Sequence, residues 1–220
     1  MWNHCSIAIG ERGLEGELCT VEPARGLVVF AHGSGSSRRS RRNVQVAQTL
    51  QDRGLGTLLF DLLTPGEADD RAKVFDIPLL ARRVLDALDA LPPRLIDLPL
   101  GLFGASTGAA AALVAAASRP DSVRAVVSRG GRPDLARDVL ERVQAATLLI
   151  VGGADREVLA LNRAAYGQMR CEKRIDVVPR ATHLFEEAGA LETVAALASD
   201  WFLRHLLPRN SGHSAGGLTP

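Results

Sequence analysis

The chain has 220 residues, and 46% of them are hydrophobic, which is enough to build one large buried core. Its 26 Lys and Arg residues nearly balance its 25 Asp and Glu residues, so no net field favours nucleic acid or an anionic membrane as a partner. The start lacks a basic segment followed by an apolar run, and the longest apolar stretch, 109–117, is too short to span a bilayer. These features predict a cytoplasmic protein, a monomer or small homo-oligomer, with neither nucleic acid nor membrane as a partner.

The cysteines argue against a metal centre and against a disulfide framework. Cys5, Cys19 and Cys171 are odd in number and widely spaced, and no C-x-x-C pair occurs. We therefore expect three reduced, partly buried thiols and no bound metal.

The first 21 residues predict an antiparallel hairpin, because the alternating segments 6–9 and 14–21 flank the turn-forming residues 11–13. After Pro23 the pattern changes to apolar runs, which are typical of strands covered on both faces, and these are separated by segments with helical spacing of apolar residues. The predicted strands are 27–31, 55–60, 98–103, 123–127, 146–151 and 171–178, and a helix over 190–206 closes the fold.

Strands that alternate with helices predict an α/β fold with a mostly parallel, doubly wound sheet. Neither an internal repeat nor a second domain is visible, so a single domain is predicted over 1–207. The remainder, 208–220, is rich in Gly and Ser and is predicted to be a disordered tail.

The segment 104–108 is Gly-Ala-Ser-Thr-Gly, and it lies between a predicted strand and an alanine-rich helix. G-x-S-x-G in this strand-turn-helix context is the pattern of a nucleophile elbow, in which a sharp turn exposes the serine. Side chains two residues before and after the serine would collide in such a turn, and Gly104 and Gly108 leave the necessary room. Ser106 is therefore the candidate nucleophile. The alternative is that Ser106 only caps the following helix.

A serine hydroxyl needs a base to activate it, and after this kind of elbow the acid and the histidine follow in chain order. Asp155 comes directly after a predicted strand, at the edge where parallel sheets build their sites. His183 follows the last predicted strand and lies at the same edge. We assign His183 as the base and Asp155 as the acid that orients it. Asp134 and Glu157 are the rival acids, and Asp155 could instead serve as a helix N-cap.

The other histidines are weaker candidates for the base. His4 lies near the amino terminus, His205 at the outer end of the closing helix and His213 in the predicted tail, so chain order suggests no acid for any of them. His32 ends a strand ahead of the serine, and we expect it to shape a loop rather than to transfer protons.

A tetrahedral oxyanion needs two preorganised donors, one from the residue after the nucleophile and one from a loop after an earlier strand. These would be the backbone N–H groups of Thr107 and Ser34. A phosphate-binding turn is the rival interpretation of Gly33-Ser34-Gly35. It is disfavoured, since Arg38 replaces the third glycine of G-x-G-x-x-G and no P-loop motif occurs.

The segments 31–36 (AHGSGS), 104–108 (GASTG) and 181–186 (ATHLFE) together resemble the α/β-hydrolase superfamily, in its dienelactone-hydrolase-like branch. The resemblance extends over about 21–206. It implies a mostly parallel sheet of about eight strands, a Ser-His-Asp triad, and hydrolysis of a small carboxylic ester or lactone without a cofactor. The named dienelactone hydrolases carry cysteine where this chain has Ser106. Similar sequences also occur joined to a phosphoribosyltransferase domain, whose phosphate loop is absent from these residues.

Arg38, Arg39, Arg41 and Arg42 form a local positive cluster in a nearly neutral protein. Two interpretations are open: the cluster is a solvated loop, or Arg41 and Arg42 hold a substrate carboxylate or phosphate. The segment 64–71, after another strand, either covers the site as a mobile loop or lies on the surface.

The connection 128–144 is long enough for a loop and a short helix but not for a cap domain, so we expect a shallow, open site that favours short acyl chains. A thioesterase, an acyltransferase or a peptidase would use the same triad, and a hydrolase fold without catalysis could serve as a binding module. These alternatives stay open at the level of the sequence.

Overall fold

A computed structural model describes residues 2–206, and its centre is one eight-stranded sheet with the order β1-β2-β4-β3-β5-β6-β7-β8. β1 (Trp2–Ile9) and β2 (Leu14–Val21) form the predicted antiparallel hairpin, although β1 begins at Trp2 rather than at residue 6. β2 also pairs antiparallel with β4, and every later pair is parallel. The prediction of a mostly parallel, doubly wound sheet is confirmed.

The remaining strands are the apolar runs of the sequence, each within two residues of its predicted ends. They are β3 (Leu27–Ala31), β4 (Gly56–Phe60), β5 (Leu100–Ala105), β6 (Val123–Arg129), β7 (Ala146–Gly152) and β8 (Lys173–Val178). Every residue of β3, β4, β5 and β7 is buried, because helices cover both faces of the sheet. β8 is an edge strand and is only partly buried.

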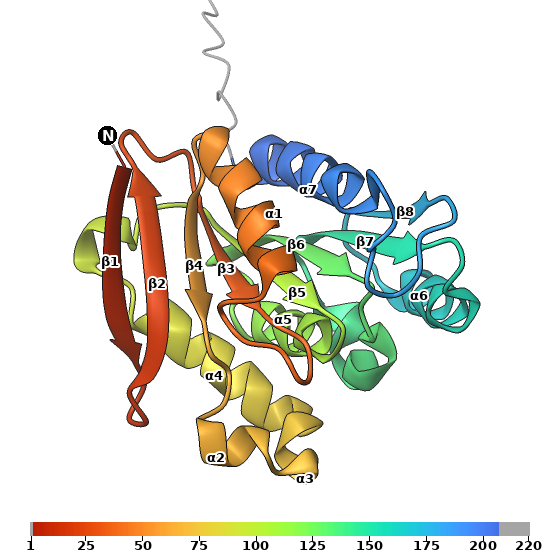
Figure 1. Ribbon diagram of the computed structural model, residues 1–220, viewed down its shortest axis with the longest axis horizontal. Coiled ribbons are helices and arrows are strands. Elements are labelled where there is room, and N and C mark those ends of the chain that lie inside the picture. The colour runs from red at the N-terminus through yellow and green to blue at the C-terminus, as the bar shows by residue number, and fades with distance from the viewer. Residues whose placement is uncertain (1, 207–220) are drawn as a thin grey trace, which may run out of the picture.

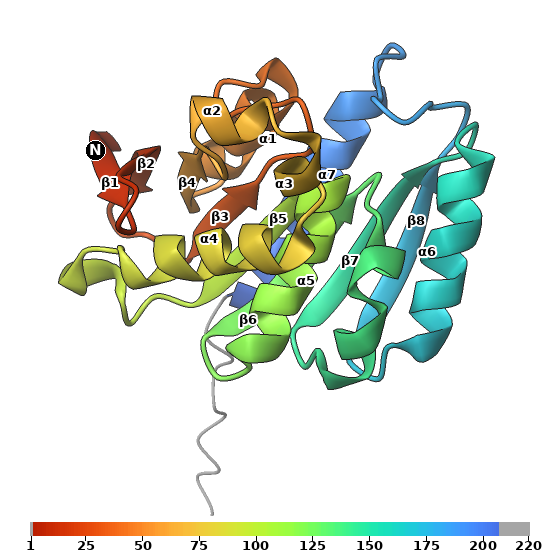
Figure 2. The same ribbon diagram turned by 90° about the horizontal axis from the view of Figure 1, so that it is seen from below.

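Two layers of helices lie on opposite faces of the sheet (Figures 1 and 2). One layer consists of α1 (Arg41–Asp52) and α7 (Ala190–Leu206), which bury Phe30, Phe103 and Val127 against the sheet. The other layer buries the second core and is formed by α4 (Ile77–Asp89), α5 (Thr107–Ser118), α6 (Arg156–Gln168) and the 3-10 helix η2 (Pro133–Arg142).

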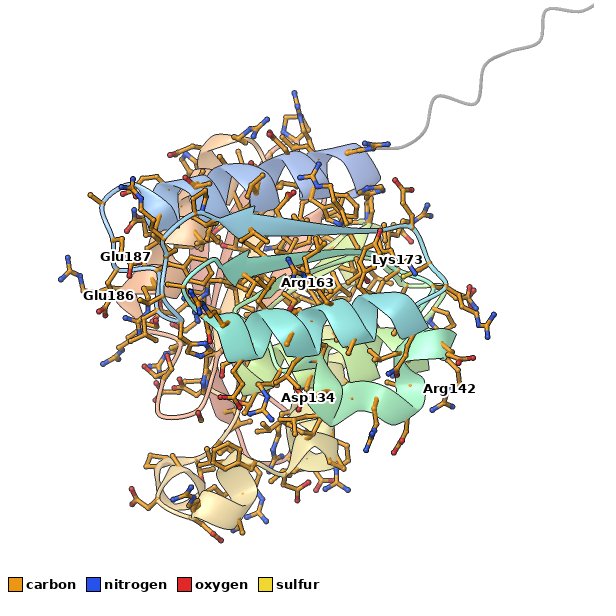
Figure 3. All side chains as sticks on the ribbon, turned by 90° about the vertical axis from the view of Figure 1, so that its right-hand side faces the viewer. Asp134, Arg142, Arg163, Lys173, Glu186 and Glu187 are labelled. Carbon is orange, nitrogen blue, oxygen red and sulfur yellow. The ribbon has the colours of Figure 1, made fainter. Side chains whose placement is uncertain are left out.

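The carboxyl ends of the parallel strands meet at one edge of the sheet. Figure 3 shows Glu186 and Glu187 beyond the arrowheads of β7 and β8, whereas Lys173 and Arg142 lie at the opposite end. The loops after β3, β5, β7 and β8 therefore all reach this edge, which is where the sequence places the candidate site residues.

The segment 64–71 differs from its prediction as a loop. It carries two short helices, α2 (Pro65–Ala68) and α3 (Arg71–Val74). Thr64 and Glu67 form a capping box at the start of α2, and the Asp70 side chain caps α3. Side-chain caps at the N-termini of these two turns favour a helical conformation. The sequence shows no apolar periodicity that would predict a helix there. We call residues 64–76 the α2–α3 segment.

No separate cap domain interrupts residues 2–206, and the 3-10 helix η1 (Pro93–Leu95) completes the elements. Within the same residues, none of the helices combines the length and apolarity that a membrane crossing requires. Cys5, Cys19 and Cys171 are free thiols, of which Cys5 is exposed. The predicted tail, 208–220, lies outside the described residues.

Candidate active site

Ser106 lies at a strained turn between β5 and α5. Its backbone has φ 50° and ψ −120°, a region that L-residues rarely adopt. The two flanking glycines are required by the packing of this turn: a Cβ at Gly104 would lie 2.4 Å from Ala109 Cα, and a Cβ at Gly108 would lie 2.2 Å from the Ala31 carbonyl oxygen. The Ser106 side chain makes no capping hydrogen bond to α5, which disfavours a purely structural role.

The structure brings Asp155 and His183 together. Asp155 Oδ2 lies 2.8 Å from His183 Nδ1, across the ends of β7 and β8. The Ala154 N–H donates to the Ala181 carbonyl oxygen over 2.9 Å, so the turn after β7 is tied to the loop that carries His183. An ionised Asp155 fixes the tautomer with the proton on Nδ1, and Nε2 is then free to accept a proton.

The turn after β6 connects the elbow to the histidine. The Ser106 N–H donates to the Arg129 carbonyl oxygen over 3.3 Å, and the Arg132 N–H donates to the Ser106 carbonyl oxygen over 3.1 Å. Between them Gly130 has φ 51°, and a Cβ there would lie 3.5 Å from His183 Nδ1. One tight turn therefore touches both Ser106 and His183.

The rival acids are placed elsewhere. Both carboxylate oxygens of Asp134 accept from the Arg132 guanidinium, over 2.8 and 2.7 Å. Figure 3 shows Asp134 below α6, away from Glu186 and Glu187 in the His183 loop. Glu157 lies in the first turn of α6. Neither rival is hydrogen-bonded to His183 in the described part of the chain.

The glycine-rich loop after β3 lies beside the elbow. A Cβ at Gly33 would be 3.1 Å from Ser106 Cβ, so glycine leaves space next to the nucleophile. The Ser34 N–H donates to Thr107 Oγ1 over 3.1 Å, which ties this loop to the first residue of α5. The Thr107 N–H has no acceptor within the helix because it belongs to the first turn. The two donors predicted for an oxyanion thus lie side by side, with the Ser34 N–H held by the Thr107 hydroxyl.

His32 takes the structural role that the sequence predicts for it. It is buried, its Nε2 accepts from the Leu62 N–H over 3.0 Å, and its Nδ1 lies 2.9 Å from the Gly33 carbonyl oxygen. Nε2 must be unprotonated to accept, so the proton is on Nδ1, where it is donated to Gly33. Burial lowers the pKa of His32, which keeps the ring neutral.

The arginine cluster divides into two parts. Arg38 is not solvated: its side chain is 11% exposed and forms ion pairs with Glu15, Glu17 and Asp61. These pairs fasten the loop after β3 to the neighbouring strands. Arg41 and Arg42 begin α1, and Arg42 Nη1 pairs with the Glu186 carboxylate over 3.1 Å.

A pocket of about 400 Å³ opens beside the two predicted oxyanion donors. Ser34 and Thr107 both line it, together with the rest of the loop after β3. Its apolar wall comes from the chain after β4, the α2–α3 segment and α4, through Leu62, Leu63, Val74 and Leu80. The α2–α3 segment thus forms part of the wall of this pocket.

Sequence reasoning missed these pocket residues and also Arg129. Arg129 ends β6, two residues beyond the predicted end of that strand, and its side chain is buried. A charged residue two positions after the end of an apolar run was the available signal. The pocket gave no comparable signal, since its apolar residues also belong to the core.

Comparisons with known proteins agree with this architecture. The family model of the alpha/beta hydrolase fold matches residues 26–175. A solved structure of dienelactone hydrolase from Anabaena variabilis is 54% identical, with a TM-score of 0.89, and the match covers 94% of this chain and 98% of that one. Est1E from Butyrivibrio proteoclasticus, at 16% identity, shares the fold with a TM-score of 0.76 over 90% of this chain and 98% of its own.

Proteins from two strains of Mycobacterium tuberculosis, provisionally named phosphoribosyl transferase, are 58% identical to this chain over 202 residues. The match covers 91% of this chain but only 46% of the length of those proteins. Their name therefore describes a protein about twice as long.

Proposed function

Because this chain belongs to the α/β-hydrolase fold family, we propose that it is a serine hydrolase that cleaves small carboxylic esters or lactones through an acyl-enzyme intermediate. The observations that carry the proposal are the 2.8 Å contact of Asp155 with His183 and the strained backbone of Ser106 at the turn between β5 and α5. The dienelactone hydrolase of Anabaena variabilis, at 54% identity, adds support for this reaction class.

The reaction follows from the roles that the geometry supports. Ser106 Oγ attacks the carbonyl carbon while His183 Nε2 takes its proton, and the Asp155 carboxylate stabilises the imidazolium that forms. The imidazolium then gives the proton to the leaving alkoxide. In the second half of the reaction, water attacks the acyl-enzyme while His183 takes a proton from it. The imidazolium then gives a proton to Ser106 Oγ, and the acid product and free Ser106 are released.

The oxyanion forms at the mouth of the 400 Å³ pocket, since Ser34 and Thr107 line that pocket. The Ser34 N–H donates to Thr107 Oγ1 in the free protein, so an oxyanion must share this donor with the hydroxyl or displace the hydroxyl, whereas the Thr107 N–H has no acceptor within α5. The acyl group extends from the carbonyl into the apolar part of the pocket.

The test is a screen of the purified protein against short esters, thioesters and lactones, with the Ser106→Ala protein as the control. A serine-directed phosphonate should label Ser106, as peptide mass spectrometry would show. We expect Ser106→Ala to lower kcat by at least about 10³-fold without changing the unfolding temperature much. Undiminished turnover in Ser106→Ala would refute the assignment.

The acid is tested by a matched pair of variants. Asp155→Asn should lower kcat about 10³- to 10⁴-fold because the wrong tautomer of His183 is then favoured. Asp134→Asn removes an equal charge but breaks only the pair with Arg132, so its kcat should stay within about threefold of the original. Equal losses in both variants would contradict the role of Asp155.

A further inference from the structure

Arg129 is a buried cation with no anionic partner among residues 2–206. Its side chain shares a face of β6 with Ala125 and Val127, and the residue is 8% exposed. In the part of the chain that the structure describes, Nε and Nη1 have no hydrogen-bond partner, and Nη2 has only a long contact, 3.5 Å, with Asn43 Oδ1. Within residues 2–206 no carboxylate forms an ion pair with it. A buried guanidinium normally has such a partner, because an unpaired buried charge is strongly destabilising.

The surroundings of Arg129 are positive rather than negative. Asn43 belongs to the first turn of α1, and the preceding Arg42 is close enough to disfavour the charged form of Arg129. Burial and, second, this Arg42 charge lower the pKa of Arg129 to about 10. Arg42 itself has a buried Nε without a partner.

The start of α1 adds to this positive character. The first turn of a helix favours Asp or Glu, because its free N–H groups carry partial positive charge. Here the first turn contains Arg41 and Arg42 and no acidic residue, and the Ser40 side chain makes no capping hydrogen bond. The guanidinium groups of Arg42 and Arg129 thus lie near the N-terminus of α1, and no acidic side chain of residues 2–206 neutralises Arg129.

This cluster lies on the leaving-group side of the nucleophile. The acyl pocket is on the face covered by α4 and α5, as its walls Leu62 and Leu80 belong to that core. Arg129 faces the opposite layer, and its own backbone carbonyl accepts from the Ser106 N–H. The next residue, Gly130, lies near His183, since a Cβ added to it would be 3.5 Å from His183 Nδ1, and His183 must protonate the leaving group.

We propose that Arg129 and Arg42 bind an anionic group, a carboxylate or a phosphate, on the alcohol part of the substrate. This inference rests on the proposed hydrolase function and narrows its substrate class to esters of acidic alcohols. The planar guanidinium matches either anion through paired hydrogen bonds.

Glu186 shows how a carboxylate binds to one member of this cluster. Its carboxylate pairs with Arg42 Nη1 over 3.1 Å from the His183 loop, and its side chain is 65% exposed. An exposed pair of this kind contributes little stability, so a ligand anion can displace it. Glu186 thus occupies Arg42, while no carboxylate of residues 2–206 pairs with Arg129.

The first experiment compares three acetyl esters, those of glycolate, of 2-hydroxyethyl phosphate and of the neutral 2-methoxyethanol. Arg129→Met should lower kcat/KM for the two anionic esters about 10- to 100-fold and for the neutral ester less than about threefold. Glu186→Gln should raise kcat/KM for the anionic esters. Arg124→Gln is the matched control, because Arg124 is exposed at the other end of β6. The two anionic esters distinguish carboxylate from phosphate.

A stability measurement separates binding from packing. Met fills a similar volume without a buried charge, so Arg129→Met should unfold at an equal or higher temperature than the original protein. A structural role for Arg129 would instead lower the unfolding temperature and affect neutral and anionic esters equally, and that result would overturn the proposal.

Direct binding does not depend on turnover. In the Ser106→Ala protein, inorganic phosphate or acetate should raise the unfolding temperature, and Arg129→Met should abolish this shift. If no ester is cleaved but this anion effect depends on Arg129, the proposed function fails and the anion site stands. If neutral esters are cleaved and neither anion binds through Arg129, the anion site fails alone.

Discussion

At the scale of single residues, His32 shows how a polar group is built into the edge of the site. Its two ring nitrogens join the end of β3 to the chain after β4, through Gly33 and Leu62. The ring is neutral because both contacts fit only one tautomer and because burial lowers its pKa. His32 thereby positions the loop that carries Ser34.

The neutral state of His32 predicts a dependence of stability on pH. Below about pH 6.5 a histidine in the unfolded chain is protonated, whereas His32 in the native protein stays neutral. The free energy of unfolding should therefore fall as the pH decreases, by up to about 1.4 kcal/mol per pH unit. The free energy of unfolding, measured by urea denaturation at several pH values between 7.5 and 5, should fall less steeply with decreasing pH in His32→Gln than in the original protein. An identical dependence of the free energy of unfolding on pH in both proteins would exclude this role for His32.

At the scale of elements, the elbow depends on close contact between β3, β5 and α5. Gly108, in the first turn of α5, packs against the backbone at the end of β3. A methyl group there would lie 2.2 Å from the Ala31 carbonyl oxygen and 2.4 Å from that of His32. Both obstacles are buried backbone atoms, one in the last residue of β3 and one in the residue after it, so they cannot rotate away as a side chain could.

Gly108→Ala should therefore destabilise the protein by about 3 kcal/mol or more, through forced separation of α5 from β3. Thermal unfolding measures this loss, and failure to obtain folded protein agrees with it. Gly167→Ala is the matched control: nothing lies within 4 Å of its added Cβ on α6, so stability should rise by about 0.5–1 kcal/mol. A Gly108→Ala protein as stable as the original would contradict the packing argument.

At the scale of the whole molecule, the nucleophile lies between two different environments. The face of α4 and α5 offers the apolar 400 Å³ pocket, and the face of α1 offers the uncompensated Arg129. A substrate that reaches across the sheet edge would place an apolar acyl group on one side and a polar leaving group on the other.

The pocket predicts a limited dependence on acyl length. Each methylene that enters it gains at most about 0.8 kcal/mol, or about fourfold in kcat/KM, and the gain should stop once the pocket is full. A series of p-nitrophenyl esters measures this. Ala68→Phe, on α2 at the pocket, should shift the plateau to shorter chains, whereas Ala72→Phe, on α3 and not in the pocket lining, should not. A steady rise of kcat/KM with acyl length, continuing through long chains, would refute an acyl pocket of this size.

The sequence by itself determined the order of strands and helices and the candidates on the loops. Strands buried on both faces are mostly apolar, so β3 to β7 are visible in the sequence as predominantly apolar runs. Gly104 and Gly108 mark the elbow because the backbone contacts there tolerate no side chain. Requirements of this local kind can be recognised from neighbouring residues in the sequence.

Only the tertiary structure decided which distant groups meet. The sequence favours Asp155 as the acid and leaves Asp134 as a rival. In the structure, the pairing of β7 with β8 places Asp155 beside His183, while Asp134 pairs with Arg132. The acyl pocket and the unpaired state of Arg129 are likewise properties of packing. They depend on what surrounds a side chain in space, and the sequence around Leu62 or Arg129 does not contain that information.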